Sequence, residues 1–119
     1  MIKLLMLVSR KQGTSREDFR NYYERAHAPL AAGLMAHCKR YVRNFVADEP
    51  TGPVGFDAVT EMWFDVDGPW DVAKKSLSDA SSAQILAQDE VKFIDRAATR
   101  IFTVHEHETP ADGLPANRR

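Results

Sequence analysis

His27 is the side chain in this sequence best suited to proton transfer near neutral pH. Imidazole gains and loses a proton close to pH 7 without special tuning, and it is a common general base. His27 follows Tyr23 by four residues and Phe19 by eight, so all three lie along one stripe of a helix. A structural role competes, because a histidine near a helix end can bind the last carbonyl oxygens and the helix dipole. A catalytic base and a helix cap both remain open.

Two carboxylates, Asp57 and Glu61, share one face of an expected strand with Val59 and Trp63. Carboxylates on a face that otherwise favours burial are costly unless they are paired or functional. Either group can orient His27. Alternatively, Asp57 caps the preceding loop and Glu61 pairs with an arginine of a neighbouring strand.

Aromatic side chains provide candidate walls for a ligand pocket. Tyrosine and tryptophan combine an apolar surface with a polar tip, which suits a flat, apolar or aromatic ligand. We take Tyr41 and Trp63 as candidate substrate-binding residues. The helical spacing of Tyr22 and Tyr23 is also typical of plain core packing.

Signals for metals and cofactors are few. His105 and His107 share a face of the last expected strand and can bind zinc or iron only if a third ligand approaches. The sequence has no glycine-rich phosphate loop, dinucleotide-binding fingerprint or nucleophile elbow. Cys38 is the only cysteine and is typical of a buried, inert thiol. We therefore expect no metal and no cofactor.

The elements that must position these residues alternate between strands and helices. The first helix starts at a capping pattern in residues 14–17, with a cap residue three positions before Glu17. Pro29 is expected to interrupt this helix, because proline lacks the amide hydrogen and disfavours helical geometry before it. Strands are expected over residues 2–8, 38–47, 57–66 and 100–107. Further helical segments are expected over residues 30–36, 70–77 and 82–95.

This order predicts an α+β fold, the ferredoxin-like split βαβ unit, in which a four-stranded antiparallel sheet carries its helices on one face. The first strand is apolar on both sides, with Leu4 and Met6 opposite Leu5 and Leu7. A bare apolar sheet face is rare in soluble monomers. We therefore expect a homodimer in which the two sheets face one another.

Length and charge limit the remaining possibilities. The 119 residues suit one domain, expected over residues 1–108, followed by a disordered tail over 109–119. The net charge of -1 gives no field for nucleic acid or an anionic membrane. The apolar run at residues 4–8 is far too short to span a bilayer. A single cysteine forbids an intramolecular disulfide, so we expect a cytoplasmic protein.

Three blocks of the sequence resemble the EthD family of dimeric α+β barrel proteins. They are residues 10–15 continuing through Glu17, Phe19 and Tyr22-Tyr23 to His27-Ala28-Pro29-Leu30, then residues 56–65, then Asp89-Glu90 with Phe93-Ile94-Asp95. The resemblance implies a dimer with a pocket between the sheet and the first helix, at Tyr23, His27, Asp57 and Glu61. Similar fungal proteins are dehydratases or tailoring enzymes that act on aromatic polyketides. The family usually has glycine where this chain has Ala58.

These observations lead to one functional hypothesis and two alternatives. The first is a cofactor-independent enzyme that dehydrates, cyclises or isomerises a small, carbonyl-bearing aromatic or cyclic compound. His27 is then the base, Glu61 or Asp57 its partner, and Tyr23 and Tyr41 donors to the enolate oxygen. The alternatives are a non-catalytic binding or accessory protein for a hydrophobic metabolite, and a haem-handling protein with His27 or His37 as axial ligand.

Overall fold

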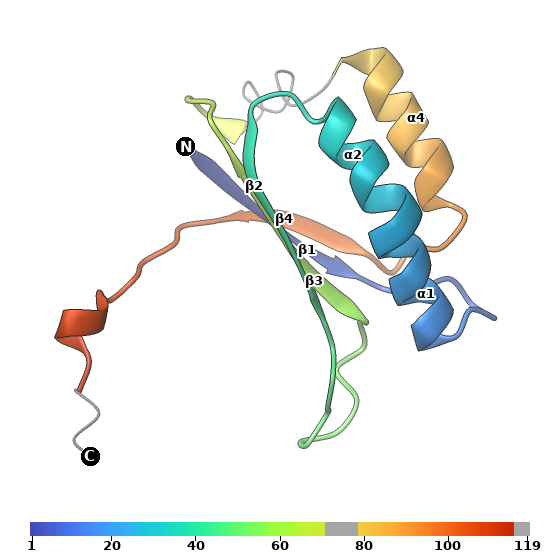
Figure 1. Ribbon diagram of the computed structural model, residues 1–119, viewed down its shortest axis with the longest axis horizontal. Helices are drawn as coiled ribbons and strands as arrows, with labels where there is room; N and C mark the ends of the chain where they lie inside the picture. The colour runs from blue at the N-terminus through green and yellow to red at the C-terminus, as the bar shows by residue number, and fades with distance from the viewer. Residues whose placement is uncertain (71–78, 116–119) are drawn as a thin grey trace.

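A computed structural model describes residues 1–70 and 79–115 of the chain. Its centre is a four-stranded antiparallel sheet with helices on one face (Figure 1). The strand order is β2-β3-β1-β4, which confirms the predicted ferredoxin-like α+β fold. The strands are β1 (Ile2–Val8), β2 (Cys38–Phe45), β3 (Ala58–Phe64) and β4 (Arg100–Val104). The last three end two or three residues earlier than the sequence predicts.

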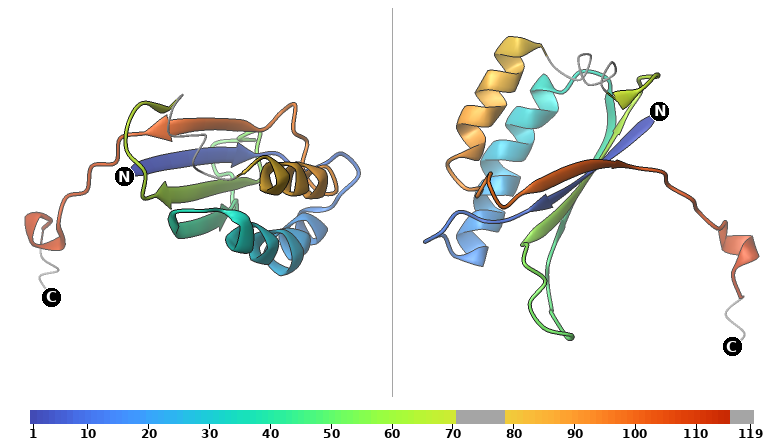
Figure 2. Two further views of the ribbon diagram at one scale, coloured as in Figure 1. Left: turned by 90° about the horizontal axis from the view of Figure 1, so that it is seen from above. Right: turned by 180° about the vertical axis from the view of Figure 1, so that it is seen from behind.

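The helices form two antiparallel arms that lie side by side over the sheet (Figures 1 and 2). The first arm is continuous and consists of α1 (Arg16–Tyr22), a π-helical turn η1 (Tyr23–His27) and α2 (Ala28–Leu34). The second arm is α4 (Ala80–Glu90). Apart from Trp70, the helix predicted over residues 70–77 lies outside the described residues. No helix in the described part of the chain is long and apolar enough to cross a membrane.

Side-chain caps fix where both arms begin. The Ser15 side chain accepts a hydrogen bond from the Asp18 amide at 3.0 Å, so α1 starts one residue after the position that the pairing with Glu17 predicts. The Asp79 side chain accepts from the Ser82 amide at 2.7 Å. That cap starts α4 two residues before the predicted start.

Pro29 does not break the first arm, so the predicted interruption at this residue is wrong. The irregularity lies upstream, where the Ala28 amide donates to the Tyr23 carbonyl across a wide π-helical turn. Proline is tolerated in the first turn of a helical segment, because the amide hydrogen that it lacks has no obligatory partner there. The π turn thus lets the helix continue through Pro29 into α2.

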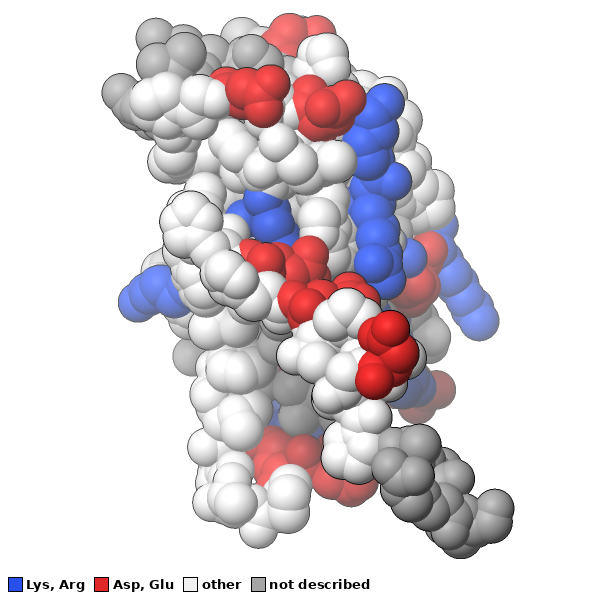
Figure 3. Space-filling model, turned by 90° about the vertical axis from the view of Figure 1, so that its left-hand side faces the viewer, with Lys and Arg blue, Asp and Glu red and all other residues white. Residues whose placement is uncertain are grey.

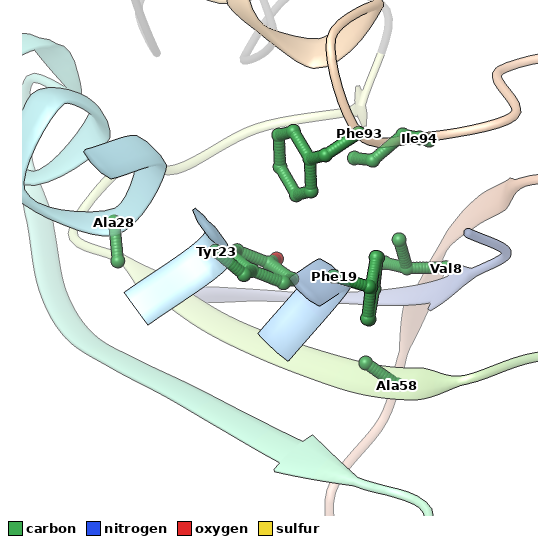
Figure 4. Close-up of a cluster of buried hydrophobic side chains, with 7 residues drawn as sticks. All are labelled: Val8, Phe19, Tyr23, Ala28, Ala58, Phe93 and Ile94. Atoms are coloured by element: carbon green, nitrogen blue, oxygen red, sulfur yellow. The ribbon is translucent and has the colours of Figure 1, made fainter. Parts of the chain in front are cut away.

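The main core lies between the sheet and the two arms (Figure 4). Phe93, which follows α4 and is 1% exposed, packs against an aromatic layer provided by the first arm. Its ring centroid lies 5.8 Å from that of Phe19, 5.2 Å from that of Tyr23 and 4.9 Å from that of His27. Phe93 therefore fixes the second arm against the residues that carry the candidate chemistry.

The opposite face of the sheet, which we call the outer face, is formed by the alternate strand residues that point away from the helices. Figure 3 shows this side of the molecule, where most of the surface is uncharged and the charged side chains gather in clusters. Its apolar residues include Leu5, Leu7 and Val59, which are only partly buried, and Phe102, which is 41% exposed. No described helix covers this face.

The chain leaves the sheet after Val104 and runs away from the body of the molecule (Figure 2). Residues 105–115 are exposed, and Ala111–Gly113 form a single 3-10 turn, η3. The disorder expected for residues 109–119 stays a prediction.

Candidate active site

The site centres on a buried pair formed by His27 at the end of η1 and Asp89 in the last turn of α4. His27 is 4% exposed and Asp89 is 8% exposed. The Nδ1 atom of His27 lies 2.8 Å from Oδ2 of Asp89. The His27 side chain therefore binds a carboxylate of the other arm, and the predicted capping of helix carbonyls is not its role.

Asp89 stays ionised because its hydrogen-bond donors outweigh the cost of its burial. Burial and the negative end of the α4 dipole both disfavour a charge at this position. The Tyr22 hydroxyl donates to Oδ1 at 2.6 Å, His27 contacts Oδ2, and the Lys92 Nζ atom lies 3.5 Å away. The hydrogen bonds from Tyr22 and His27 lower the pKa of Asp89 despite its burial. The same bond to Asp89 raises the pKa of Tyr22 to about 12.

This arrangement determines which nitrogen of His27 is available for chemistry. An ionised carboxylate only accepts hydrogen bonds, so Nδ1 of His27 must be the donor to Asp89. The neutral imidazole then has its lone pair on Nε2, which has no hydrogen-bond partner among the described residues. A histidine held in this tautomer by a carboxylate is the arrangement that general-base enzymes use.

Tyr23 and Tyr41 lie on the same side of the sheet as His27. The Tyr23 hydroxyl lies 2.6 Å from Oγ1 of the fully buried Thr60, and its ring lies 5.7 Å from that of His27. Burial raises the pKa of Tyr23. Burial, together with the neighbouring Tyr23, also raises the pKa of Tyr41. Both phenols therefore stay protonated at neutral pH, and their predicted role as hydrogen-bond donors to a substrate stays a prediction.

A cavity of about 190 Å³ lies beside Glu90, the residue that follows Asp89 in the chain. It is lined by Met6, Glu90, Ile94, Arg96, Thr99 and Ile101. Burial raises the pKa of Glu90, although the electrostatic interactions with His27 and Arg96 act against this effect. Glu90 both lines the cavity and interacts electrostatically with His27, so it connects the two.

The predicted pairing of His27 with Glu61 or Asp57 is wrong. Glu61 is on the outer face, on the opposite side of the sheet from His27, because it alternates with the buried Thr60 and Met62. It pairs with Lys3 at 2.7 Å and accepts from Asn44 at 2.9 Å. This is the structural alternative considered above, with a lysine in place of the expected arginine.

Asp57 lies before β3 and binds the loop that follows β1. It accepts a hydrogen bond from the Arg10 amide at 2.9 Å, and the Arg16 Nε atom lies 3.4 Å from its carboxylate. Asp57 therefore ties this loop and the start of α1 to β3, apart from the His27–Asp89 pair.

Trp63 is also on the outer face and so does not join Tyr41. The Lys3 ammonium lies 4.3 Å from its ring centroid and the Arg40 guanidinium 4.6 Å, while its indole nitrogen donates to Glu106 at 2.9 Å. A substrate bound among His27, Tyr23 and Tyr41 cannot reach it through the sheet.

The remaining candidate ligands are dispersed. His37 is exposed at the turn between α2 and β2, with a positive φ of 64°. His105 and His107 are exposed beyond β4. Within residues 1–70 and 79–115, no group of three or more histidine, cysteine or acidic side chains is arranged to hold a metal ion.

Sequence reasoning missed Asp89, although a signal was present. Asp89 and Glu90 are adjacent acids near the end of an expected helix, where the helix dipole favours cations. Acids placed against the dipole and next to a buried aromatic residue indicate a specific partner. Which residue that partner is could not be read from their spacing, since His27 lies 62 positions away.

We expect Asp89→Asn to reveal the contribution of the pair to stability as a function of pH. The pKa of Asp89 is below its ordinary value of 3.8, so its ionisation stabilises the fold above that pH. The stabilisation is lost as the pH falls through the lowered pKa. Urea unfolding of both proteins should therefore show a difference in free energy that is largest at neutral pH and shrinks below about pH 4. A difference that stays constant over this range would contradict an ionised Asp89.

This geometry defines a class of protein. It is a ferredoxin-like α+β domain with a buried histidine–aspartate pair and a small cavity beside Glu90. The chain belongs to the EthD domain family, whose model matches residues 11–97. This match confirms the family that the three sequence blocks indicate.

Solved structures share the fold at low sequence identity. An EthD family protein from Bacillus halodurans C-125 has a TM-score of 0.65 at 18% identity, covering 90% of this chain and all of that one. A protein from Arabidopsis thaliana gives 0.63 at 12% identity, covering 92% of this chain and 99% of that chain. HapK from Hahella chejuensis gives 0.59 at 11%, covering 98% of this chain and 100% of that chain.

A similarity to a curated enzyme is local. The dehydratase ustZ of Ustilaginoidea virens is 54% identical over 35 residues, which is 29% of this chain. The matched region spans only 25% of that dehydratase.

Proposed function

We propose that this protein is a cofactor-independent enzyme that removes water from a small, carbonyl-bearing aromatic or cyclic compound. The observation that carries the proposal is the His27–Asp89 hydrogen bond of 2.8 Å, supported by Tyr22 on the other carboxylate oxygen. The name of the partial relative, a dehydratase, agrees with this class of reaction. The polar groups gathered at the His27–Asp89 pair favour catalysis over passive carriage of a hydrophobic metabolite.

In the proposed reaction, Nε2 of His27 takes a proton from the carbon next to the substrate carbonyl. The electron pair of the broken C–H bond forms an enolate, whose oxygen accepts hydrogen bonds from Tyr23 and Tyr41. When the enolate collapses, a new C=C bond forms and the β-hydroxyl group leaves. That group takes the proton that the His27 imidazolium holds, so the base is restored and the products are water and the unsaturated carbonyl compound.

The burial of His27 limits the direction of approach. The rings of Phe93 and Tyr23 both pack against the imidazole of His27. Asp89 occupies its Nδ1 atom. The proposal therefore requires the substrate to reach Nε2 from the side of Glu90. Such a dry environment strengthens the hydrogen bonds to the enolate.

The first half of this reaction can be measured before the natural substrate is identified. β-Tetralone is an aromatic-fused cyclic ketone with acidic protons next to its carbonyl group. In heavy water, proton NMR follows the replacement of these protons by deuterium. The wild-type protein should accelerate this exchange above the buffer rate, and His27 should be required for the acceleration.

We also propose that the protein is a homodimer joined through the outer face. The partly buried Leu5, Leu7 and Val59 and the exposed Phe102 form an apolar surface that no described helix covers. Lys3 and Glu61 pair on the same face and so carry no unbalanced charge into the interface. A second copy, with the same surface, buries these groups symmetrically.

Light scattering at micromolar concentration should therefore give a mass of 26.8 kDa, twice the 13.4 kDa of the chain. Phe102→Glu should shift the protein towards the monomer, because a charge on the outer face must be desolvated in the dimer. Ile85→Glu is the matched control, since Ile85 on α4 is 40% exposed and Phe102 is 41% exposed. A monomeric wild-type protein, or equal effects of both variants, would contradict the proposed interface.

A further inference from the structure

The cavity beside Glu90 has three apolar lining residues, two charged residues and a threonine. Met6 and Ile101 lie on the neighbouring strands β1 and β4, and Ile94 follows the turn after α4. These three side chains form an apolar lining. Glu90 and Arg96 are the charged residues of the lining.

Thr99 also lines the cavity, but its hydroxyl group already has hydrogen-bond partners within the protein. The hydroxyl donates to the Asp95 carbonyl at 2.8 Å and accepts from the Ser9 amide at 3.2 Å. A ligand in this cavity therefore finds its polar contacts at Glu90 and Arg96.

The guanidinium group of Arg96 has N–H donors that are available to a ligand. Its Nε atom lies 3.5 Å from Oε1 of Glu90, which is too long for a strong charge-assisted hydrogen bond. Its guanidinium group makes no hydrogen bond to a described residue, whereas those of Arg16 and Arg43 donate to Glu49 and Glu24. Guanidinium has five N–H donors in a planar fork that matches a carboxylate with two parallel hydrogen bonds.

We propose that Arg96 anchors a carboxylate of the ligand, with the apolar body of the ligand lying on Met6, Ile94 and Ile101. The inference rests on the proposed function, because it names the substrate class of the same site as an aromatic or cyclic carbonyl compound that carries a carboxylate. The chemistry of the lining supports an apolar acid over a sugar or a polar amide, since it offers no free polar side chain besides Arg96 and its neighbour Glu90.

Glu90 competes with the ligand for Arg96, and this gives the proposal a distinctive signature. Removal of the Arg96 charge should weaken the binding of a carboxylate. Removal of the Glu90 charge should strengthen carboxylate binding for two reasons. The Arg96 guanidinium then loses its internal partner, and the repulsion between the Glu90 carboxylate and the ligand carboxylate disappears. Loss of charge at Arg96 and loss of charge at Glu90 should thus change the affinity for a carboxylate in opposite directions.

The experiment uses benzoate and its neutral analogue benzamide as probes of the full-length protein. Methyl NMR signals of Met6 and Ile101 should shift on titration with benzoate, and much less with benzamide. Arg96→Gln should weaken benzoate binding by about tenfold, the equivalent of roughly 1.4 kcal/mol. Glu90→Gln should tighten it several-fold.

Two exposed residues provide matched controls for the change of charge. Arg25→Gln on η1 and Glu17→Gln on α1 alter the net charge equally but lie outside this cavity, so they should leave benzoate binding unchanged. The proposal is overturned if benzamide binds as tightly as benzoate, if Arg96→Gln retains binding, or if neither methyl signal shifts. Binding does not require His27, so loss of proton exchange with retained benzoate binding would reject the proposed function and leave the anchor standing.

Discussion

His27→Gln should lower the protein-catalysed exchange of β-tetralone protons by about 10²- to 10⁴-fold, the usual contribution of a general base. Glutamine retains an N–H donor that can bind Asp89, so the carboxylate keeps a partner in the core. The variant has no lone pair on nitrogen that can accept a proton near pH 7. The loss should therefore appear in the exchange rate, while the protein remains folded.

The control is His37→Gln, which makes the same substitution at an exposed turn. Its exchange rate should equal that of the wild type. Near-UV circular dichroism and urea unfolding show whether the His27 variant keeps its tertiary packing. A folded His27→Gln protein with undiminished exchange would reject His27 as the base, and a wild-type protein without exchange above buffer would reject this chemistry for β-tetralone.

Phe93→Ala should lower the free energy of unfolding by about 3–5 kcal/mol, the range for truncation of a buried aromatic residue. Phe93 is 1% exposed and packs against Phe19, Tyr22 and Tyr23. Truncation removes these contacts and leaves a cavity between the two arms. Because the His27 ring lies 4.9 Å from that of Phe93, the variant should also lose proton exchange.

Val91→Ala is the comparison for this effect, because Val91 lies two residues earlier and is 52% exposed. Its unfolding free energy should stay within about 0.5 kcal/mol of the wild type. Urea unfolding at a fixed pH measures both variants. A loss below about 1 kcal/mol for Phe93→Ala would show that the arms are not held together through this ring.

The alternation of strands and helices was readable from the sequence because it depends on local patterns. The apolar run at residues 2–8 matches β1 residue for residue, and the order of elements predicts the ferredoxin-like sheet. Helix starts followed nearby caps, although Ser15 and Asp79 had to be identified in the structure. Pro29 was misjudged because the π turn before it depends on the packing of Tyr23 and His27 in the core.

The sequence also selected His27 and Tyr23 as the residues for chemistry, and the family match over residues 11–97 agrees with the blocks that contain them. Residue type and helical spacing were sufficient to place both residues on one buried stripe, since they lie on one segment, while their part in the chemistry stays a prediction. The strand period correctly placed Glu61 and Trp63 on one face. It could not show that this face is turned away from His27, because that depends on which side of the sheet the helices cover.

The partner of His27 was decided by tertiary structure alone. Asp89 reaches the imidazole from another arm, 62 residues further along the chain, and only the packing of α4 against the first arm brings their atoms to 2.8 Å. The cavity arises in the same way, from residues of β1, β4 and the segments around them. Local propensity determines which residues form helices and strands, whereas the choice of carboxylate for His27 is a long-range contact that becomes favourable only when both arms are buried on the sheet.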